Sequence, residues 1–423
     1  MKKIKNDNFL MYIIAIISKL SIVLLSLFTT AMINRCLGVE LKGEYAYINN
    51  WVSILITIFS LGIGQTYSTY RRKYGEEPKN TFIALTLIQS AIVFMLFIIA
   101  CLLKANYYVC MSLLVTVFAV LRSNILYIAA IEDIKKRDIN NIIYKILYTI
   151  LVFIVFINKI KSLDVMIGLL VADEIIIVVG TFIKYKFKPD LKFIKKDKAT
   201  LAKIYKLGSI SMLMFLMMTL NYHLDVIMLK KMADSYSVGL YSVGVTLANL
   251  LWLVPDAFKD VLFHKTAKED SIKDIVLSVK FNIVLDVIII IGFIILGKWF
   301  IKFMYGTEYL NSYLVTIILF IGSLSMVIYK LIHPLYISKG KQIIVFIILL
   351  ISVVINAICN SVLIPAFGII GAAIASVVSY TICSLMFLIK FCREYQVKIS
   401  EFFIIKKSEV NKIKNIILRR GEN

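Results

Sequence analysis

The sequence is poor in acidic residues, in histidine and in any pattern of metal-binding or catalytic side chains. Its 423 residues include 26 Asp and Glu, six Cys and three His. The cysteines form no Cys-x-x-Cys pair and no cluster with histidine, so they predict neither a metal site nor a disulfide framework. There is also no P-loop, no Gly-rich nucleotide cradle and no Ser/His/Asp grouping. These absences argue against an enzyme, and we expect no cofactor and no metal. They also leave an ion gradient or the substrate's own gradient as the energy source for any uphill movement.

Long apolar segments dominate what is present. Hydrophobic residues make up 60% of the sequence, more than a water-soluble domain can bury. Twelve windows come close to the roughly 20 residues needed to cross the hydrocarbon core as helices. The windows are 9–33, 45–66, 82–103, 107–130, 142–158, 163–183, 204–229, 238–264, 275–297, 312–336, 343–364 and 368–390. The first is expected to be a retained span, because it is long and no small-residue cleavage site follows. The sequence therefore predicts an all-α polytopic membrane protein with 12 transmembrane helices.

Basic residues set the expected orientation. Lys and Arg outnumber Asp and Glu by 48 to 26, an excess that a nucleic-acid-binding protein could also show. Here the basic residues lie in short loops between apolar runs. With the N-terminus in the cytoplasm, 32 of them fall on the inner side and nine on the outer side. This bias follows the positive-inside rule, so we expect both termini in the cytoplasm and no nucleic-acid partner. The outer loops are short, and no extracytoplasmic domain is expected.

A basic stretch near the middle of the chain predicts two halves. Lys184–Lys203 contains eight Lys among 20 residues and no apolar run long enough to span a membrane. We interpret it as a cytoplasmic linker, with an ordinary basic loop in one undivided bundle as the alternative. The expected parts are an N-terminal six-helix lobe (1–185), the linker (186–203), a C-terminal six-helix lobe (204–392) and a basic cytoplasmic tail (393–423). The tail alternates apolar residues with Lys and is expected to lie along the inner membrane surface or to be loosely ordered.

An internal similarity agrees with two halves. The segment NRCLGVELKGEYAYI (34–48) follows the first span, and KKMADSYSVGLYSVG (230–244) follows the seventh, at an offset of 196. Each has a basic residue leaving a span and a Gly-x-Tyr opening the next, at Gly43/Tyr45 and Gly239/Tyr241. Because six spans separate the two segments, the halves would form a parallel repeat.

Charged residues inside the spans are the first candidates for function, since each costs at least about 2.5–3.5 kcal/mol on insertion scales. Lys19, Arg122 and Lys330 are cations on spans one, four and ten. Together they form a candidate receptor for an anion. Another charged pair, Asp256 and Lys259, lies one turn apart on span eight and is expected to be structural.

Acidic and neutral polar residues complete the candidate site. Asp225 on span seven and the adjacent Asp173 and Glu174 on span six are candidates for binding a coupling ion, H+ or Na+. For Asp225, pairing with one of the three cations is the alternative. One of the adjacent pair is expected to bond a neighbouring helix instead. The neutral candidates for binding a hydroxyl-rich ligand are Asn49, Gln65, Asn221 and Asn249. Helix–helix hydrogen bonding explains these neutral residues equally well.

Several segments resemble the Wzx-type polysaccharide flippases of the multidrug/oligosaccharidyl-lipid/polysaccharide (MOP) exporter superfamily. They are the segment 34–48 already quoted, DVIMLKKMADSYSVGLYSVG (225–244), LFHKTAK (262–268), MYGTEYLNSY (304–313) and NSVLIPAFGIIGAAIASVVSY (360–380). The last is the most specific, although it is a small-residue packing motif.

The resemblance implies two six-helix lobes around a central cavity, lined mainly by spans one, two, seven and eight. This favours Lys19 and Asp225 over Arg122 and Lys330. The implied activity is movement of an undecaprenyl-pyrophosphate-linked oligosaccharide repeat unit, of O-antigen, capsule or a similar glycan, from the inner to the outer leaflet. Ion-gradient-coupled alternating access in a bacterial inner membrane is the implied mechanism, with the bilayer and polysaccharide polymerase or assembly machinery as partners.

Three other functions stay open. A drug/cation antiporter of the same superfamily is expected to have a more acidic and apolar cavity. An integral-membrane polysaccharide polymerase or glycosyltransferase usually needs a large outer loop. A non-transporting scaffold is disfavoured only by the deep charges.

Overall fold

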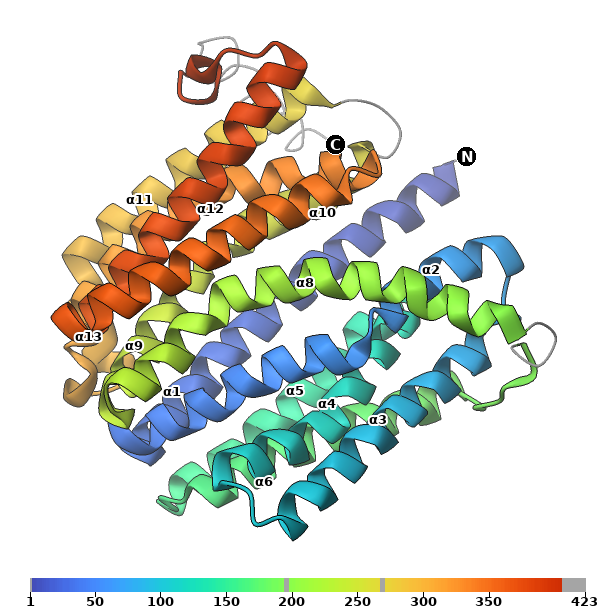
Figure 1. Cartoon of the computed structure of the whole chain (residues 1–423), viewed down its shortest axis with the longest axis horizontal. Helices are drawn as coiled ribbons and strands as arrows, with labels where there is room; N and C mark the ends of the chain where they lie inside the picture. The colour runs from blue at the N-terminus through green and yellow to red at the C-terminus, as the bar shows by residue number, and fades with distance from the viewer. Residues whose placement is uncertain (1, 194–197, 267–270, 405–423) are drawn as a thin grey trace. The chain divides into compact units, whose positions relative to one another are not determined.

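The computed structural model describes residues 2–193, 198–266 and 271–404. Within these ranges, the side chains of residues 2–20, 198, 260–261 and 263–266 are not described. The described backbone is almost entirely helical and contains no strand (Figure 1). The elements are α1 (Lys2–Ser60), α2 (Ile63–Tyr74), α3 (Lys79–Leu102), α4 (Tyr107–Glu132), α5 (Ile134–Ile157), α6 (Leu163–Tyr185), α8 (Lys198–Met232), α9 (Ser235–Leu250), α10 (Leu253–Thr266), α11 (Ile272–Met304), η1 (Thr307–Tyr309), α12 (Ser312–Ser338), α13 (Gln342–Tyr395) and η2 (Ile399–Phe402).

Nine described helical segments are long and apolar enough to cross a membrane, or ten if the bent pair α9–α10 is one span. This confirms the predicted all-α membrane class, while the number 12 stays a prediction. Two of the nine are 54 residues long, about 80 Å at 1.5 Å per residue, and so exceed one crossing of the bilayer.

Glycines break both long helices. The break in α1 is at Gly38 (φ 71°, ψ 178°) and that in α13 is at Gly368 (φ 55°, ψ −129°). Both backbones are in the positive-φ region that glycine adopts at no steric cost. The arms of α1 run in opposite directions on the two sides of its break (Figure 1). The outer loop expected between the first two windows is thus a helix break rather than a loop.

The helices group into two compact units. Unit 1 consists of Met1–Gly239 and Phe303–Glu308, and unit 2 consists of Leu240–Lys302 and Tyr309–Asn423. The short Phe303–Glu308 segment belongs with unit 1 because Arg35 donates hydrogen bonds to the carbonyls of Phe303 and Met304. Arg35 therefore satisfies carbonyl groups that the end of α11 leaves without an intrahelical partner.

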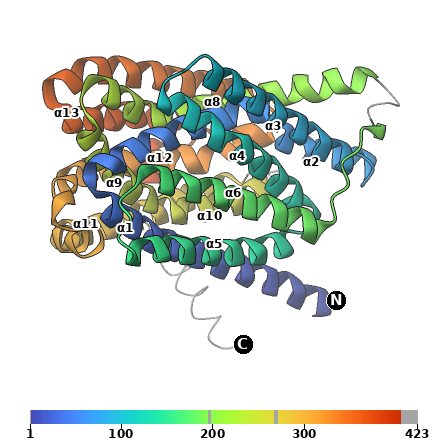
Figure 2. The same ribbon diagram turned by 90° about the horizontal axis from the view of Figure 1, so that it is seen from below.

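In unit 1, α4 is the central helix. It packs against α1, α2, α3, α5 and α6, and α1 lies beside α5 (Figure 2). Local sequence defines the ends of these helices. Asn106 accepts a hydrogen bond from the N–H of Tyr108 at 3.0 Å, and Asp133 accepts one from the N–H of Lys136 at 2.9 Å. Such N-caps satisfy amide groups that would otherwise lack a partner at the start of α4 and α5.

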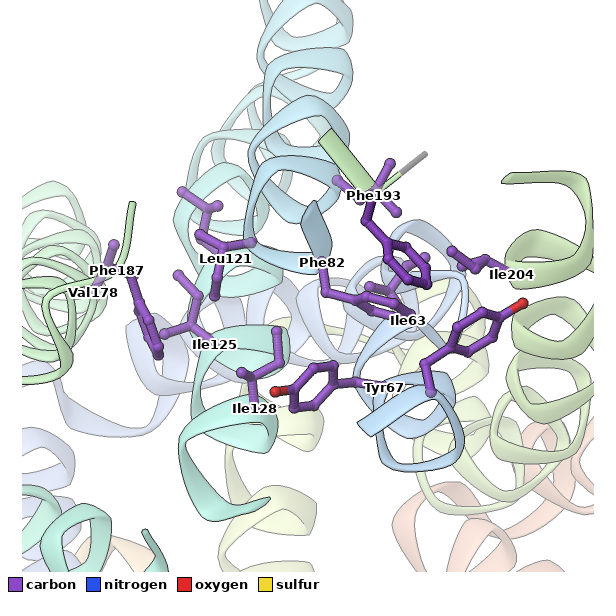
Figure 3. Close-up of a cluster of buried hydrophobic side chains, with 13 residues drawn as sticks. Ile63, Tyr67, Phe82, Leu121, Ile125, Ile128, Val178, Phe187, Phe193 and Ile204 are labelled. Carbon is purple, nitrogen blue, oxygen red and sulfur yellow. The ribbon is translucent and has the colours of Figure 1, made fainter. Parts of the chain in front are cut away.

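An aromatic and aliphatic cluster packs residues of α2, α3, α4, α6 and α8 together in unit 1 (Figure 3). Tyr67 and Phe82 pack at a ring-centroid distance of 5.2 Å. Phe187 and Phe193, from the predicted linker, are buried in the same cluster. This part of the basic stretch is therefore anchored to unit 1 by its two aromatic residues.

In unit 2, α12 is the central helix, packed against α10 and α13. The two arms of α13 are joined by Ser352, whose hydroxyl donates to the carbonyl of Ser379 at 3.0 Å, and by Asn356, whose amide donates to the Ser379 hydroxyl at 3.3 Å. Ala372, Ala375 and Ser376 of the small-residue packing motif are fully buried. Small side chains permit this close helix packing.

Candidate functional site

An ionic cluster lies inside unit 1 between α4, α5 and α6. Arg122 Nε of α4 donates to Glu174 Oε2 of α6. Asp173, the next residue on α6, has a buried Oδ1 without a hydrogen-bond partner. Lys145 of α5 lies within electrostatic range of both Asp173 and Arg122. The four groups carry two positive and two negative formal charges, and Glu174 is the member of the acidic pair that bonds a neighbouring helix.

A polar seam joins α1 to α8 within unit 1. Glu44 and Lys230 form an ion pair at 2.6 Å. Farther along, Asn50 Oδ1 contacts His223 Nδ1. We use the name α1–α8 seam for these two pairs and the one between Thr57 and Thr219, whose hydroxyls are 3.1 Å apart.

A cavity of about 120 Å³ opens along the last part of the α1–α8 seam. It is lined by Ile56, Thr57, Ser60, Gly62, Gln65, Ser123, Met212, Phe215 and Thr219. The Oε1 atom of Gln65 is buried and has no hydrogen-bond partner. Hydroxyl and amide groups beside a few apolar side chains form the kind of surface that binds a sugar. The cavity thus contains one predicted site residue with an acceptor that the protein leaves unused.

Two glycines bring the other end of the seam together. A Cβ atom at Gly43 would overlap the carbonyl of Ser235, and one at Gly239 would overlap the carbonyl of Val39. Asp234 precedes this crossing and accepts a hydrogen bond from the N–H of Ser237 at 2.7 Å. That bond lowers the pKa of Asp234 below its usual value. The unit is therefore closely packed where α1 meets the start of α9.

Unit 2 contains a separate charged group. Asp256 of α10 lies 2.9 Å from Lys259 and 2.9 Å from Lys330 of α12. Lys330 also lies 4.5 Å from the centre of the Trp252 ring, a cation–π contact. The expected Asp256–Lys259 pair is confirmed, and Lys330, predicted to receive an anion, shares the same carboxylate.

The remaining predicted residues are dispersed. Asn49 donates to the carbonyl of Tyr45 at 2.9 Å, and Asn249 is exposed near the end of α9. Asn221 and Asp225 are fully buried, one turn apart on α8. Lys19 lies in α1, but its side chain is outside the described part. The described residues contain no group of three or more His, Cys, Asp or Glu that could hold a metal.

Sequence reasoning missed several polar partners. Lys145 lies close to the start of the fifth apolar window, and its cation inside a span was an available signal. Thr57 and Thr219 gave none, because isolated threonines are common in membrane helices. Their pairing across 162 residues depends on the packing of α1 against α8.

Residues 11–254, more than half of the chain, match the family model described as polysaccharide biosynthesis protein. The chain belongs to the polysaccharide biosynthesis protein family. A search of curated protein sequences finds no match.

This family member shares its fold with several solved structures. It is similar to lipid II flippase MurJ in an inward closed conformation, with a TM-score of 0.71, 18% identity and coverage of 93% of this chain and 89% of that chain. It is also similar to a variant of the Vibrio cholerae MATE transporter VcmN, with a TM-score of 0.63, 15% identity and coverage of 94% and 98%. A third similarity is to an inward-facing multidrug resistance MATE family transporter of the MOP superfamily, at a TM-score of 0.57, 14% identity and coverage of 91% and 98%. These similarities confirm the all-α membrane fold predicted from the sequence.

Proposed function

We propose that this protein is a flippase that moves undecaprenyl-pyrophosphate-linked oligosaccharide repeat units from the cytoplasmic to the outer leaflet of a bacterial inner membrane. The observation that carries the proposal is the polysaccharide biosynthesis family match in a chain that has the fold of a lipid II flippase. The glycan would be O-antigen, capsule or a similar surface polysaccharide, and a polymerase or assembly machinery would receive the product.

The polar cavity of unit 1 supports a sugar ligand. Gln65 offers an unused carbonyl oxygen, and Thr57 and Thr219 offer hydroxyls beside it. Sugars bind to such groups through hydrogen bonds that replace those with water. We assign the first sugar contacts to this cavity, with Asn49, Asn221 and Asn249 as further proposed contacts.

The fixed cations support a pyrophosphate. Lys19 is the first proposed contact. Arg122 and Lys330 are already paired with Glu174 and Asp256, so in this proposal the pyrophosphate contacts them only by taking the place of a carboxylate. A doubly charged headgroup makes such an exchange feasible, because charge-assisted hydrogen bonds to phosphate are strong.

The proposed mechanism is alternating access between an N-terminal lobe (1–185) and a C-terminal lobe (204–392) around a central cavity, with both termini in the cytoplasm. Asp225, Asp173 and Glu174 are the proposed sites for a coupling H+ or Na+. Buried acidic groups in membrane helices commonly serve such exchange.

Gene deletion followed by lipid extraction tests the function. We expect lipid-linked single repeat units to accumulate and to be inaccessible to a membrane-impermeant sugar-modifying reagent in intact cells. Reintroducing the gene should restore surface glycan. Unpolymerised units exposed on the outer face would instead indicate a polymerase, and unchanged glycan and lipid intermediates would reject the proposal.

The similarity to MATE structures favours one second candidate, a drug or cation antiporter. It predicts that the deletion strain becomes sensitive to cationic drugs while its surface glycan is unchanged. The two phenotypes are measured on the same strain and separate the candidates directly.

A further inference from the structure

Asp286 is a buried acid in the apolar middle of α11. It is the fifteenth residue of a 33-residue helix, about 21 Å from the start at 1.5 Å per residue. Its side chain is fully buried, and neither carboxyl oxygen has a hydrogen-bond partner. An ionised carboxylate in this position would have lost its water without gaining a donor or a cation, which is strongly unfavourable.

The residue one turn earlier presents another unused acceptor. Asn282 is also fully buried, and its amide nitrogen donates to the carbonyl of Ser278 at 2.8 Å. That bond directs the amide nitrogen toward the helix backbone and leaves Asn282 Oδ1 without a partner. Residues four apart on a helix are neighbours on one face. The Asn282 amide oxygen and the Asp286 carboxylate therefore lie on one buried face, and neither of these acceptors has a donor.

None of the described charged groups on the helices packed against α11 bonds to Asp286. Phe258 of α10 and Phe320 of α12 contact Phe281 and Phe293 of α11. Besides Asp286, the charged and titratable groups on these helices whose side chains are described are Asp256, Lys259, Lys273, Asp274, Lys280, Lys298, Lys302, Tyr313, Tyr329, Lys330, His333 and Tyr336. No ion pair or hydrogen bond joins any of these described side chains to Asp286.

We propose that Asp286 is a proton-binding site of unit 2, occupied by a proton when the surrounding helices are packed as in this structure. A proton removes the buried charge and supplies a donor, since a carboxylic acid has one O–H. That O–H is suited to donate to Asn282 Oδ1, which satisfies both orphaned groups at once. A metal cation fits less well, because one carboxylate and one amide give three oxygens and hard cations take six or more.

This site is separate from the ion-binding residues proposed in unit 1. Proton binding at Asp286 does not depend on the proposed function; only the role of that proton in transport rests on it. Release of the proton requires water or a cation to reach the buried face of α11. Proton exchange is then confined to a conformation in which that face opens, so the site would couple a pH gradient to a change in helix packing.

Infrared spectroscopy of the purified full-length protein in lipid nanodiscs tests the assignment. At neutral pH, wild type should show a protonated-carboxyl C=O band that Asp286→Asn lacks. Asp274→Asn, a change of the same kind in the first turn of α11, should retain the band. Asn282→Leu should shift the band, because the acid then loses its acceptor. If wild type and Asp286→Asn have the same carboxyl bands, Asp286 is ionised and the proposal is wrong.

Two further measurements keep the test decisive. If Asp286→Asn does not fold, a pH titration of the wild-type band and its shift in Asn282→Leu still identify the acid. Added Na+ should leave the band unchanged at constant pH; its loss would mean that a metal cation occupies the site and would overturn the proton assignment. None of these readouts uses a lipid-linked oligosaccharide, so the outcome is independent of whether the flippase proposal holds.

Discussion

Gly43 and Gly239 are 196 residues apart, and each packs against the carbonyl group four residues before the other. Gly43 lies on the carbonyl of Ser235, and Gly239 lies on that of Val39. The offset between Val39 and Ser235 is also 196. The contact is thus reciprocal between equivalent positions of the two similar segments, as expected if a duplicated unit met its copy here.

Alanine at either glycine should weaken this crossing. The added methyl group would overlap a backbone carbonyl that cannot rotate away, and overpacking of this kind costs about 1–3 kcal/mol. We expect Gly43→Ala and Gly239→Ala each to lower the thermal unfolding temperature of the purified protein. Gly168→Ala in α6 is the control, because a Cβ there meets no atom within 4 Å. It should be neutral or slightly stabilising, since alanine favours a helix over glycine. Equal unfolding temperatures for all three variants would contradict the close contact.

The Arg122–Glu174 pair should show strong coupling in a double-mutant cycle. Removing either partner leaves the other charge inside unit 1. We expect a loss between the roughly 1 kcal/mol of exposed pairs and the about 3–5 kcal/mol of buried ones. Arg122→Gln combined with Glu174→Gln should cost less than the sum of the single changes, measured by thermal unfolding. Glu76→Gln, which removes the exposed partner of Arg71 at 3.3 Å, should have little effect. Additive losses would show that Arg122 and Glu174 act separately.

Gln65 should matter for transport more than for stability. Its amide oxygen has no protein partner, so Gln65→Leu removes a ligand contact without breaking a bond through that atom. We expect lower surface glycan with unchanged protein level and unfolding temperature. Gln89→Leu is the matched control, because Gln89 donates to the carbonyl of Ser60 at 3.2 Å and accepts from Asn124 at 3.1 Å. That change should destabilise the protein by about 1–3 kcal/mol. Normal glycan in Gln65→Leu would remove this residue from the proposed site.

Asp234 should make the start of α9 sensitive to acid. The pKa of Asp234 is lowered by the bond from Ser237 N–H, so its stabilising contribution is present above the unfolded-state pKa of about 3.9 and is lost as pH falls through the lower folded-state value. Hydrogen exchange of the first turn of α9 should therefore accelerate at acidic pH, after correction for intrinsic exchange. Asp234→Asn preserves a good N-cap without a titrating group and should abolish the acceleration. An unchanged pH profile in that variant would exclude Asp234 as the cause.

The membrane class and most span positions followed from sequence, because a long apolar run in lipid has few alternatives to a helix. Apolar windows do not show where one helix continues into the next without a loop, so the sequence did not predict the breaks within continuous helices at Gly38 and Gly368. The local Asp256–Lys259 pair was predictable from its spacing. The contacts of Lys330 with Asp256 and of Thr57 with Thr219 were not, because each joins residues that only tertiary packing brings together. The roles of the predicted site residues stay predictions.

The helix break at Gly38 also affects how the protein can be studied. Because α1 changes direction there without an intervening loop, that turn offers almost no chain for an antibody epitope or a protease site. Insertions at Gly38 would interrupt a continuous helical segment next to the side chains of Lys161 and Glu308. A silent result from surface labelling at this turn would therefore not mean that it faces the cytoplasm. Topology mapping is better directed to the segment around Asp234, which is exposed and lies between α8 and α9.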